Sequence, residues 1–477
     1  MKSYETVIGL EVHVELNTNS KIFCGCSTLF GAAPNTQVCP VCLGMPGALP
    51  VLNKEVVHSA VKVGLALNCA ITADGRQDRK NYFYPDLPKA YQISQSERPI
   101  GVGGYLDIEV QEGEKRIGLT RIHIEEDAGK LVHDGSKGTL IDYNRGGVPL
   151  IEIVSEPDLR SAEDVKAYLQ KLKATLLFLG VSSCKMNEGA FRCDVNLSVR
   201  KVGETQFGTR TEMKNLNSFS FIAKAIENET QRQIKVLESG GAVIQETRRW
   251  DAVKNQSFSM RTKEDAHDYR YFPDPDLMPI VLEDSYLELV KSEMPMLPED
   301  YKKSFVENYG VKSSIAEQLV STRAIAEYFK ACVPRTRYAE VLGNLIVTEG
   351  FRMLALLDED AQIPITPRAM AELATLVGEE KINLSIAKRV LADLWSSGVD
   401  KSPVDIIEKN SWWPIVDHDV LLNFGREIIE KMPQIMTDYL AGKTQSYGAF
   451  MGQMMKISGG KADPTLSETV FFELINK

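Results

Sequence analysis

GLEVHVEL, residues 9–16, alternates hydrophobic and polar residues along its whole length. A period of two is typical of a β-strand with one buried face, and successive side chains on one face lie about 7 Å apart. The polar face then carries Glu11, His13 and Glu15, whose side chains can converge on one ion. The alternative is an ordinary solvated face of an antiparallel sheet.

Further stretches predict similar charged strand faces. RIHIEEDAGK (121–130) contains three consecutive carboxylates, which repel one another unless a cation joins them. RCDVNLSVR (192–200) has one wholly polar face, TRTEMKNLNSF (209–219) alternates again, and LIEIV (150–154) places a carboxylate among apolar neighbours. The charged residues concerned are Glu125, Glu126, Asp127, Glu152, Arg192, Asp194, Arg210, Glu212 and Lys214. Together they favour a polyanion site with a bound divalent metal, with solvated sheet faces as the alternative.

Four of the eight cysteines are crowded into one short segment. Cys24 and Cys26 form one pair, and Cys39 and Cys42 form a second pair with the proline and glycine that are typical of a knuckle turn. Four thiolates can close a tetrahedral zinc site, and such a site leaves no open position for catalysis. The spacing therefore predicts structural zinc; the alternatives are free cysteines in a loop or a redox pair.

Length and composition limit the class of protein. A chain of 477 residues with 43% hydrophobic residues is long enough for two to four domains with packed cores. No apolar run reaches the roughly 18 residues that a membrane span needs, so we expect a soluble protein. The crowded cysteines do not resemble the evenly distributed framework of a secreted domain, which favours the reducing cytoplasm. A net charge of −10 argues against a general nucleic-acid coat, because phosphate binding depends on Lys and Arg.

The order of patterns predicts an α+β fold with three domains. Short strands dominate up to about Asp274, with helices near Ala60 and over 162–179 and 221–237. A proline-rich passage follows, and beyond it Thr366-Pro367 and Ser402-Pro403 are typical helix starts. We expect an antiparallel-sheet-rich domain, a helical domain and a small helical tail, over residues 1–292, 293–405 and 406–477 respectively.

Two stretches mix cations with aromatic residues: RQDRKNYFYPDLPKAYQ (76–92) and DYRYFPDPD (268–276). Nucleotide bases stack on such platforms, although the same residues beside proline can simply pin loops to a core. The sequence has no Gly-x4-Gly-Lys-Ser/Thr stretch, which argues against a P-loop as the nucleotide site. If ATP is used, metal and carboxylates must hold it.

Several long motifs, taken in order, carry a resemblance to one family. They are GLEVHVEL, CPVCLGMPG, RKNYFYPDLPKAYQISQ, RIHIEEDAGK, NRGGVPLIEIVSEPD, RCDVNLSVR, KNLNSF, QETRRWD and DYRYFPDPD, and the tail contains GQMMKISGGKADP. In this order they resemble the B subunit of the bacterial and organellar aspartyl/glutamyl-tRNA amidotransferase over essentially the whole chain. The resemblance implies a carbon–nitrogen ligase for protein biosynthesis that phosphorylates the side-chain carboxylate of mischarged Glu-tRNA or Asp-tRNA with ATP. Ammonia then displaces phosphate to give Gln-tRNA or Asn-tRNA.

The resemblance also implies that the first domain is a cradle-like catalytic domain, and it implies partners, cofactors and site residues. Ammonia would come from a separate amidase subunit, with a small linking subunit completing a heterotrimer, and the tail would bind tRNA. Magnesium would be held by Glu11, His13, Glu125 and Glu126, with Glu152 and Asp194 as companions, and zinc by Cys24, Cys26, Cys39 and Cys42. Arg192, Arg210 and Lys214 would hold phosphate oxygens, Lys80 and Lys214 would bind ATP, and Glu11, His13 and Glu126 would join these cations as catalytic residues.

Two other functions fit parts of the pattern. One is a zinc-stabilised RNA platform whose carboxylates are only structural, and the other is a metal-dependent phosphoesterase. A tRNA-independent ATPase assay separates the first of these from an activating enzyme. The motifs leave open whether Asp-tRNA, Glu-tRNA or both are substrates.

Overall fold

Strand β1 (Tyr4–Glu15) is the strand that the GLEVHVEL alternation predicts. Leu10, Val12 and Val14 are buried, while the alternate residues are partly exposed on the opposite face. β1 lies inside a ten-stranded sheet, between β12 (Phe191–Lys201) and β11 (Pro149–Ser155). The polar face of β1 therefore has a neighbouring strand on each side.

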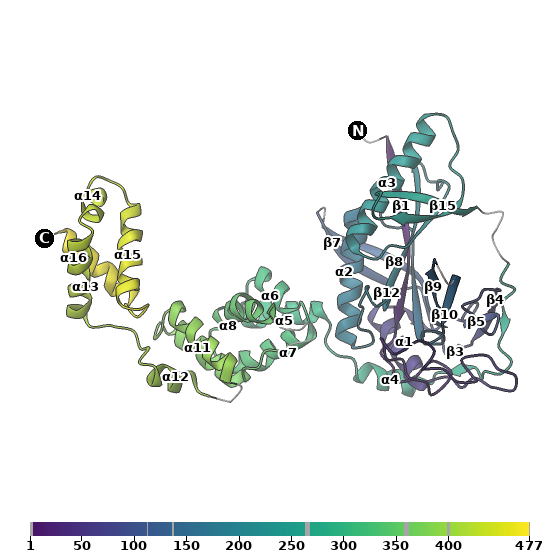
Figure 1. Cartoon of the computed structure of the whole chain (residues 1–477), viewed down its shortest axis with the longest axis horizontal. Coiled ribbons are helices and arrows are strands. Elements are labelled where there is room, and N and C mark those ends of the chain that lie inside the picture. The colour runs from purple at the N-terminus through teal and green to yellow at the C-terminus, as the bar shows by residue number, and fades with distance from the viewer. Residues whose placement is uncertain are drawn as a thin grey trace. The chain divides into compact units, whose positions relative to one another are not determined.

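The computed structural model describes residues 3–111, 113–135, 138–262, 268–356, 362–397 and 401–476. Contacts divide the chain into two units, Met1–Leu297 and Pro298–Lys477. The first is rich in strands and the second is helical, as Figure 1 shows for each unit, so the predicted α+β class is confirmed. The division falls inside the proline-rich passage, and a further division between residues 405 and 406 stays a prediction.

The large sheet is antiparallel except at one pair. Its order is β15-β14-β13-β12-β1-β11-β8-β6-β2, with β7 paired to β8, and β13 runs parallel to β14. The predicted strands around residues 121–126, 150–154 and 192–200 are all present. The remaining strands of this sheet are β2 (Ala70–Ile71), β6 (Gly101–Val102), β7 (Tyr105–Val110), β8 (Gly113–Glu126), β13 (Thr211–Lys214), β14 (Glu246–Asp251) and β15 (Gln256–Thr262).

Helices α2 (Ala162–Leu179) and α3 (Phe219–Glu238) run along one side of this sheet (Figure 1). Each begins at a serine, Ser161 or Ser218, whose hydroxyl accepts a hydrogen bond from the third residue after it. Their buried residues join the apolar faces of the strands, α1 (Lys54–Ala66) and α4 (Asp284–Ser292) in one hydrophobic core. The sheet's apolar face is thus covered, which leaves the polar face for a site.

Three small sheets complete the first unit. The cation-rich and aromatic stretches that the sequence singles out meet in one of them, because β4 (Asp78–Asn81) pairs with both β5 (Tyr91–Ser94) and β16 (Phe272–Pro273). The others pair β9 (Lys130–Asp134) with β10 (Gly138–Asp142) and β3 (Asp74–Gly75) with β17 (Ile280–Val281).

The second unit consists of helices. Both predicted starts are correct: Thr366 and Ser402 cap helices whose first residue is a proline. Its α-helices are α5 (Pro298–Tyr309), α6 (Ser313–Leu319), α7 (Arg323–Cys332), α8 (Ala339–Leu345), α9 (Phe351–Leu354), α10 (Pro367–Gly378), α11 (Leu384–Ser397), α12 (Pro403–Lys409), α13 (His418–Lys431), α14 (Gln434–Leu440), α15 (Gln445–Ile457) and α16 (Pro464–Ile475). A 3₁₀ turn, Val333–Arg335, and a π-helix, Ile346–Gly350, connect some of them.

The last four helices have a hydrophobic core of their own. It includes Leu421 of α13, Phe450 and Met454 of α15, and Phe471 of α16, all fully buried. Such a core is consistent with the small C-terminal unit that the sequence predicts. Among the described residues, the structure contains no helix with the length and hydropathy needed to cross a bilayer.

Candidate functional site

A row of polar side chains crosses three neighbouring strands of the large sheet. Glu152 of β11 is the cross-strand partner of His13 on β1 and also of His123 on β8. Glu125 lies two residues beyond His123 and therefore on the same face of β8. These four side chains form the first group of the site.

The first group is closely packed. The Nε2 atom of His13 lies 3.4 Å from Glu152 Oε2 and 3.6 Å from Glu125 Oε1. His123 approaches the same two carboxylates from the other side, at 3.2 Å and 3.4 Å, and is almost fully buried. One ligand atom each from His13, Glu125 and Glu152 lie within 4.8 Å of one another, which suits a metal ion.

A second group lies on the same face, one strand further along. Glu11 is the cross-strand partner of Asp194, and Glu212 joins them from β13, so that three carboxylates offer oxygens within 4.8 Å of one another. Asn196 donates a hydrogen bond of 2.9 Å to Glu11. Because Glu11 and His13 are two residues apart in β1, the two groups are neighbours at about 7 Å.

Burial and charge shift the pKa values of these groups strongly. Burial alone would lower the pKa of His13, but hydrogen bonding and charge from Glu152, with Glu125 adding to them, raise it to about 9. Burial and the charge of Glu152 raise the pKa of Glu11. The crowding of carboxylates thus favours any cation that enters, since each negative charge makes the next more costly.

Cations border both groups. Lys214 Nζ lies 2.5 Å from Asp194 and 2.8 Å from Glu212, and these carboxylates raise its pKa although burial would lower it. Arg192, the cross-strand partner of His13, donates a 2.8 Å hydrogen bond to Asp127. An ammonium and a guanidinium therefore lie on the polar face beside the carboxylates, where both can meet phosphate oxygens.

Lys80 lies in β4, a strand of one of the small sheets, and its charge interacts with the first group. The charge of Glu125 raises its pKa against the effect of burial, and its ammonium lies over the ring of Tyr269, 4.8 Å from the centroid. Tyr269 in turn meets Tyr82 edge to face at 6.1 Å. Arg79 ties the same strand to Asp274 through a 2.8 Å ion pair. The two aromatic stretches thus form one cationic and aromatic wall.

Two predicted site residues are not brought to these groups. Glu126 follows Glu125 in β8, so it points to the opposite face, where its carboxylate pairs with Lys89 and accepts a 2.8 Å hydrogen bond from the backbone N–H of Ile93. It lines a cavity of about 190 Å³ beside Cys42. Arg210 precedes β13 and is exposed, so it is not part of the strand face that the alternation predicts.

The four clustered cysteines come together as predicted. Cys24, Cys26, Cys39 and Cys42 place their sulfur atoms within 4.8 Å of one another, and all four are free thiols. Backbone hydrogen bonds from Leu43 to Cys39 and from Met45 to Pro40 close the turn around the second pair. The donor set and its closeness fit a tetrahedral zinc ion. Cys69, Cys184, Cys193 and Cys332 are buried elsewhere.

A buried lysine supports the cysteine cluster. Lys21 is fully buried, and its ammonium lies 3.7 Å from Cys42 Sγ and 3.1 Å from the carbonyl oxygen of Tyr143. A hydrogen bond from the Cys24 thiol lowers the pKa of Cys42 to about 4, and the charge of Lys21 acts in the same direction. A positive charge at this point offsets the negative charge that four thiolates bring to one ion.

Sequence reasoning missed two members of the groups. His123 shares a face with Glu125 through the period of two, but its alignment with Glu152 depends on strand register. The alternation puts Glu212 on a charged face but not among the ligands, because only the pairing of β13 with β12 brings it to Asp194. In both cases the missing information is a cross-strand partner.

The sheet unit, with its two acidic groups on one polar face, defines a catalytic domain. Residues 6–288 match the family described as the GatB/GatE catalytic domain, and residues 327–475 match the GatB domain. The chain belongs to the family of aspartyl/glutamyl-tRNA(Asn/Gln) amidotransferase B subunits. It is therefore a subunit of an amidotransferase of the ligase type, as the sequence motifs imply.

Relatives align from end to end. The chain is 52% identical over 479 residues to the aspartyl/glutamyl-tRNA(Asn/Gln) amidotransferase B subunit of Caldicellulosiruptor saccharolyticus, covering 99% of each chain. It is 50% identical over 475 residues to the same subunit of Caldanaerobacter subterraneus subsp. tengcongensis, covering 99% of this chain and all of the relative. The corresponding protein of Geotalea uraniireducens is 49% identical over 480 residues, with 99% coverage of both.

Proposed function

We propose that this chain activates the side-chain carboxylate of Glu or Asp attached to tRNA by phosphorylating it with ATP, and then passes it to ammonia. The name of the relatives, with aspartyl and glutamyl tRNA in it, supports this class of substrate. Glu-tRNA(Gln), Asp-tRNA(Asn) or both fit that name. The products are the corresponding Gln-tRNA(Gln) and Asn-tRNA(Asn).

The observation that carries the proposal is the pair of acidic groups on one sheet face. Phosphorylating a carboxylate brings two anions together, so the site must supply positive charge. The candidate ligands are His13, Glu125 and Glu152 in the first group and Glu11, Asp194 and Glu212 in the second. Their carboxylates are hard oxygen ligands that suit magnesium. Bound magnesium would neutralise phosphate charge and orient the triphosphate.

The chain's own cations act on the reacting groups. Lys214 lies between Asp194 and Glu212, where its ammonium can hold the transferred phosphoryl oxygens. Arg192, braced by Asp127, would hold the substrate carboxylate or its phosphorylated form. Lys80, with Tyr82 and Tyr269 beside it, would bind the nucleotide.

The chemistry balances in two steps. A carboxylate oxygen of the substrate attacks the γ-phosphorus of ATP, and ADP leaves. Ammonia then attacks the acyl carbon, and phosphate leaves with that oxygen while the nitrogen loses a proton. The second step needs ammonia kept apart from water, and the amidase partner of the same complex would supply it.

The remaining parts of the proposal concern zinc, tRNA and assembly. Cys24, Cys26, Cys39 and Cys42 would hold a structural zinc ion that fixes the loop beside the sheet. The C-terminal helices α13–α16 would bind tRNA, using exposed cations such as Lys456. The working enzyme would be a cytoplasmic heterotrimer with an amidase and a small linking subunit.

The experiment is an amidation assay on the assembled complex with each mischarged tRNA. ATP, glutamine and either Glu-tRNA(Gln) or Asp-tRNA(Asn) should give the amidated tRNA, and omitting ATP should abolish it. ATP cleavage without tRNA should be much slower than with it. A complex that binds the tRNA but forms no amide, with ATP cleavage at background, would instead favour a binding platform whose carboxylates are structural.

A further inference from the structure

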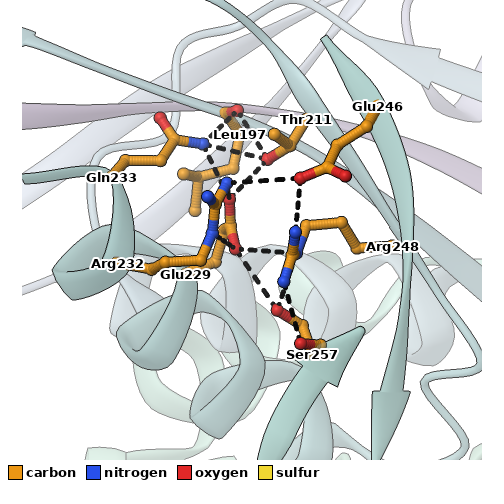
Figure 2. A network of polar contacts seen from close by, with 8 residues as sticks. All are labelled: Leu197, Thr211, Glu229, Arg232, Gln233, Glu246, Arg248 and Ser257. Atoms are coloured by element: carbon orange, nitrogen blue, oxygen red, sulfur yellow. Dashed lines mark hydrogen bonds and ion pairs between the residues drawn. The ribbon is translucent and has the colours of Figure 1, made fainter. Parts of the chain in front are cut away.

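A second set of charged residues lies on the covered side of the large sheet, behind the site. Its centre is Glu229 of α3, whose side chain is fully buried. Figure 2 shows Glu229 surrounded by side chains from α3 and from the strands at this end of the sheet. None of these residues belongs to the two acidic groups of the site. Burying a charged carboxylate is costly, and those groups do not account for it here.

Glu229 contacts residues of four structural elements, its own helix and three strands. Arg232, one turn along α3, donates to both of its oxygens at 2.8 Å and 2.6 Å. Thr211 of β13 donates to it at 2.9 Å, and Arg248 of β14 lies 3.4 Å away (Figure 2). Ser257 of β15 is also 3.4 Å away. One carboxylate therefore connects a helix to three adjacent strands.

The network reaches a fourth strand and is well satisfied. Gln233 donates to Glu229 at 3.0 Å, to Thr211 at 2.9 Å and to the Leu197 carbonyl of β12 at 3.3 Å. Burial by itself would raise the pKa of Glu229, but the hydrogen bonds from Arg232 and Gln233 hold it below its usual value. Glu229 is thus ionised, and its charge is shared among partners rather than exposed.

Strand β13 is the element that links this network to the site. It has four residues, Thr211–Lys214, and successive side chains point to opposite faces. Thr211 faces Glu229, whereas Glu212 and Lys214 belong to the acidic group on the polar face. The position of Thr211 therefore sets the position of Glu212, because the two share one peptide unit.

The neighbouring strand repeats the arrangement. Thr247 of β14 donates a 2.8 Å hydrogen bond to Glu212 on the polar face, while the next residue, Arg248, bonds to Glu246 and Ser257 on the covered face. The pairing of β13 with β14 is parallel, and loops flank β13 on both sides. In so short a strand, these side-chain bonds add to the three residue pairs that β13 forms with each neighbouring strand.

We propose that Glu229 is a positioning residue: through Thr211 and Arg248 it sets β13 so that Glu212 and Lys214 lie beside Asp194 and Glu11. The inference rests on the proposed function, in which that acidic group takes a divalent cation. A partner that orients ligands from behind typically changes metal affinity by about 10-fold to 100-fold when it is lost. Glu229 itself touches neither the metal nor the substrate.

The test is a titration of the purified full chain with Mn²⁺ as a substitute for Mg²⁺. Electron paramagnetic resonance measures the concentration of free Mn²⁺. Wild type should bind two ions, one of which Glu212→Gln removes. Glu229→Gln keeps the shape of the side chain and leaves Glu246 to pair with Arg232 and Arg248. Glu229→Gln should lower the affinity for only that ion, by at least about tenfold. Glu227→Gln, an exposed acid on the same helix, is the matched control and should bind like wild type.

A double variant separates positioning from general support. In a Glu212→Gln background, Glu229→Gln should have no further effect on Mn²⁺ binding, because the ligand through which it acts is gone. If Glu229→Gln lowers the thermal midpoint yet binds both ions like wild type, its role is structural and the inference is overturned. If wild type binds no ion that Glu212→Gln removes, the proposed metal site itself fails.

A second variant covers the case in which Glu229→Gln does not fold. Thr211→Val removes only the hydroxyl that joins β13 to Glu229, and Glu229 keeps Arg232, Gln233 and Arg248. Thr211→Val should also lower the affinity for the ion that Glu212→Gln removes. Unchanged binding in a folded Thr211→Val protein would contradict the proposal on its own.

Discussion

His13 and Glu152 are cross-strand partners at the centre of the sheet, and His13 Nε2 lies 3.4 Å from Glu152 Oε2. His123 reaches the same oxygen atom from the next strand, at 3.2 Å. A carboxylate held between two imidazoles in a largely water-free place stays ionised, because each protonated ring stabilises it. In the proposed function a divalent cation would replace the proton of His13 and be held by His13, Glu125 and Glu152.

The first prediction concerns His13. His13→Ala should abolish ATP-dependent activation of the aminoacyl group, by far more than tenfold, while tRNA affinity changes little, because His13 lies with the carboxylates that we propose to hold magnesium. Single-turnover amidation of mischarged tRNA measures the first quantity and a binding titration the second. His133→Ala is the control, since His133 is exposed on β9. Activation that persists within about tenfold, or roughly 1.4 kcal/mol, would contradict the assignment.

The second prediction is a pH dependence of stability. Folding raises the pKa of His13 from 6.5 to about 9, so the stability that its charge contributes is fully present below pH 6.5 and is lost as the pH rises through 9. With no divalent cation added, the thermal midpoint of wild type should exceed that of His13→Gln most at pH 6, and the difference should shrink towards pH 9. A difference that does not change with pH would show that the imidazole is not protonated in the folded chain.

The third prediction concerns zinc. Elemental analysis of freshly reduced protein should find one zinc per chain, and Cys39→Ser should remove it. Lys21→Met should weaken zinc retention against a chelator, because it removes the positive charge 3.7 Å from Cys42. Cys332→Ser, a buried thiol of the helical unit, should retain zinc fully. Wild-type protein without zinc would leave the cluster as free thiols.

The alternation of apolar and polar residues was the most informative pattern in the sequence. It correctly put Glu11 and His13 on one face of a strand, and it correctly predicted the buried sets of β1 and β12. The same rule separates Glu125 from Glu126, but the family motif places both with the metal, and the structure brings only Glu125 there. Alternation within a strand can be read from sequence because it depends only on local geometry.

What sequence could not supply is which strands are neighbours. The predicted ligands form two groups because Glu152 pairs across from His13, whereas Asp194 pairs across from Glu11. Register of this kind is set by contacts far apart in the chain. The start of β13 also could not be predicted, so the alternation includes Arg210 in a strand that begins one residue later.

The fourth prediction concerns the C-terminal helices. A chain ending at Ser411 keeps α12, whose Ile406 and Ile407 are buried, and removes the whole separate core of α13–α16. Assembled with its amidase partner, it should retain glutamine hydrolysis and residual ATP cleavage but lose affinity for tRNA and discrimination between tRNAs. Titrations at fixed ionic strength measure both.

A full-length variant controls for the effect of deletion. Lys456→Glu reverses an exposed charge on α15 and should weaken tRNA binding without unfolding the terminal core. Equal affinity and equal discrimination in the wild type, the truncated chain and this variant would show that tRNA recognition lies in the sheet unit instead.

The most direct test of the account follows one oxygen atom. If the carboxylate is activated by phosphorylation, its oxygen must leave with phosphate when ammonia forms the amide. Mischarged tRNA carrying ¹⁸O in the side-chain carboxylate, incubated with ATP, glutamine and the assembled complex, should yield inorganic phosphate with one ¹⁸O for each amide formed. Phosphate that carries no ¹⁸O, at the same yield of amidated tRNA, would show that ATP is cleaved by water and that the carboxylate is never phosphorylated.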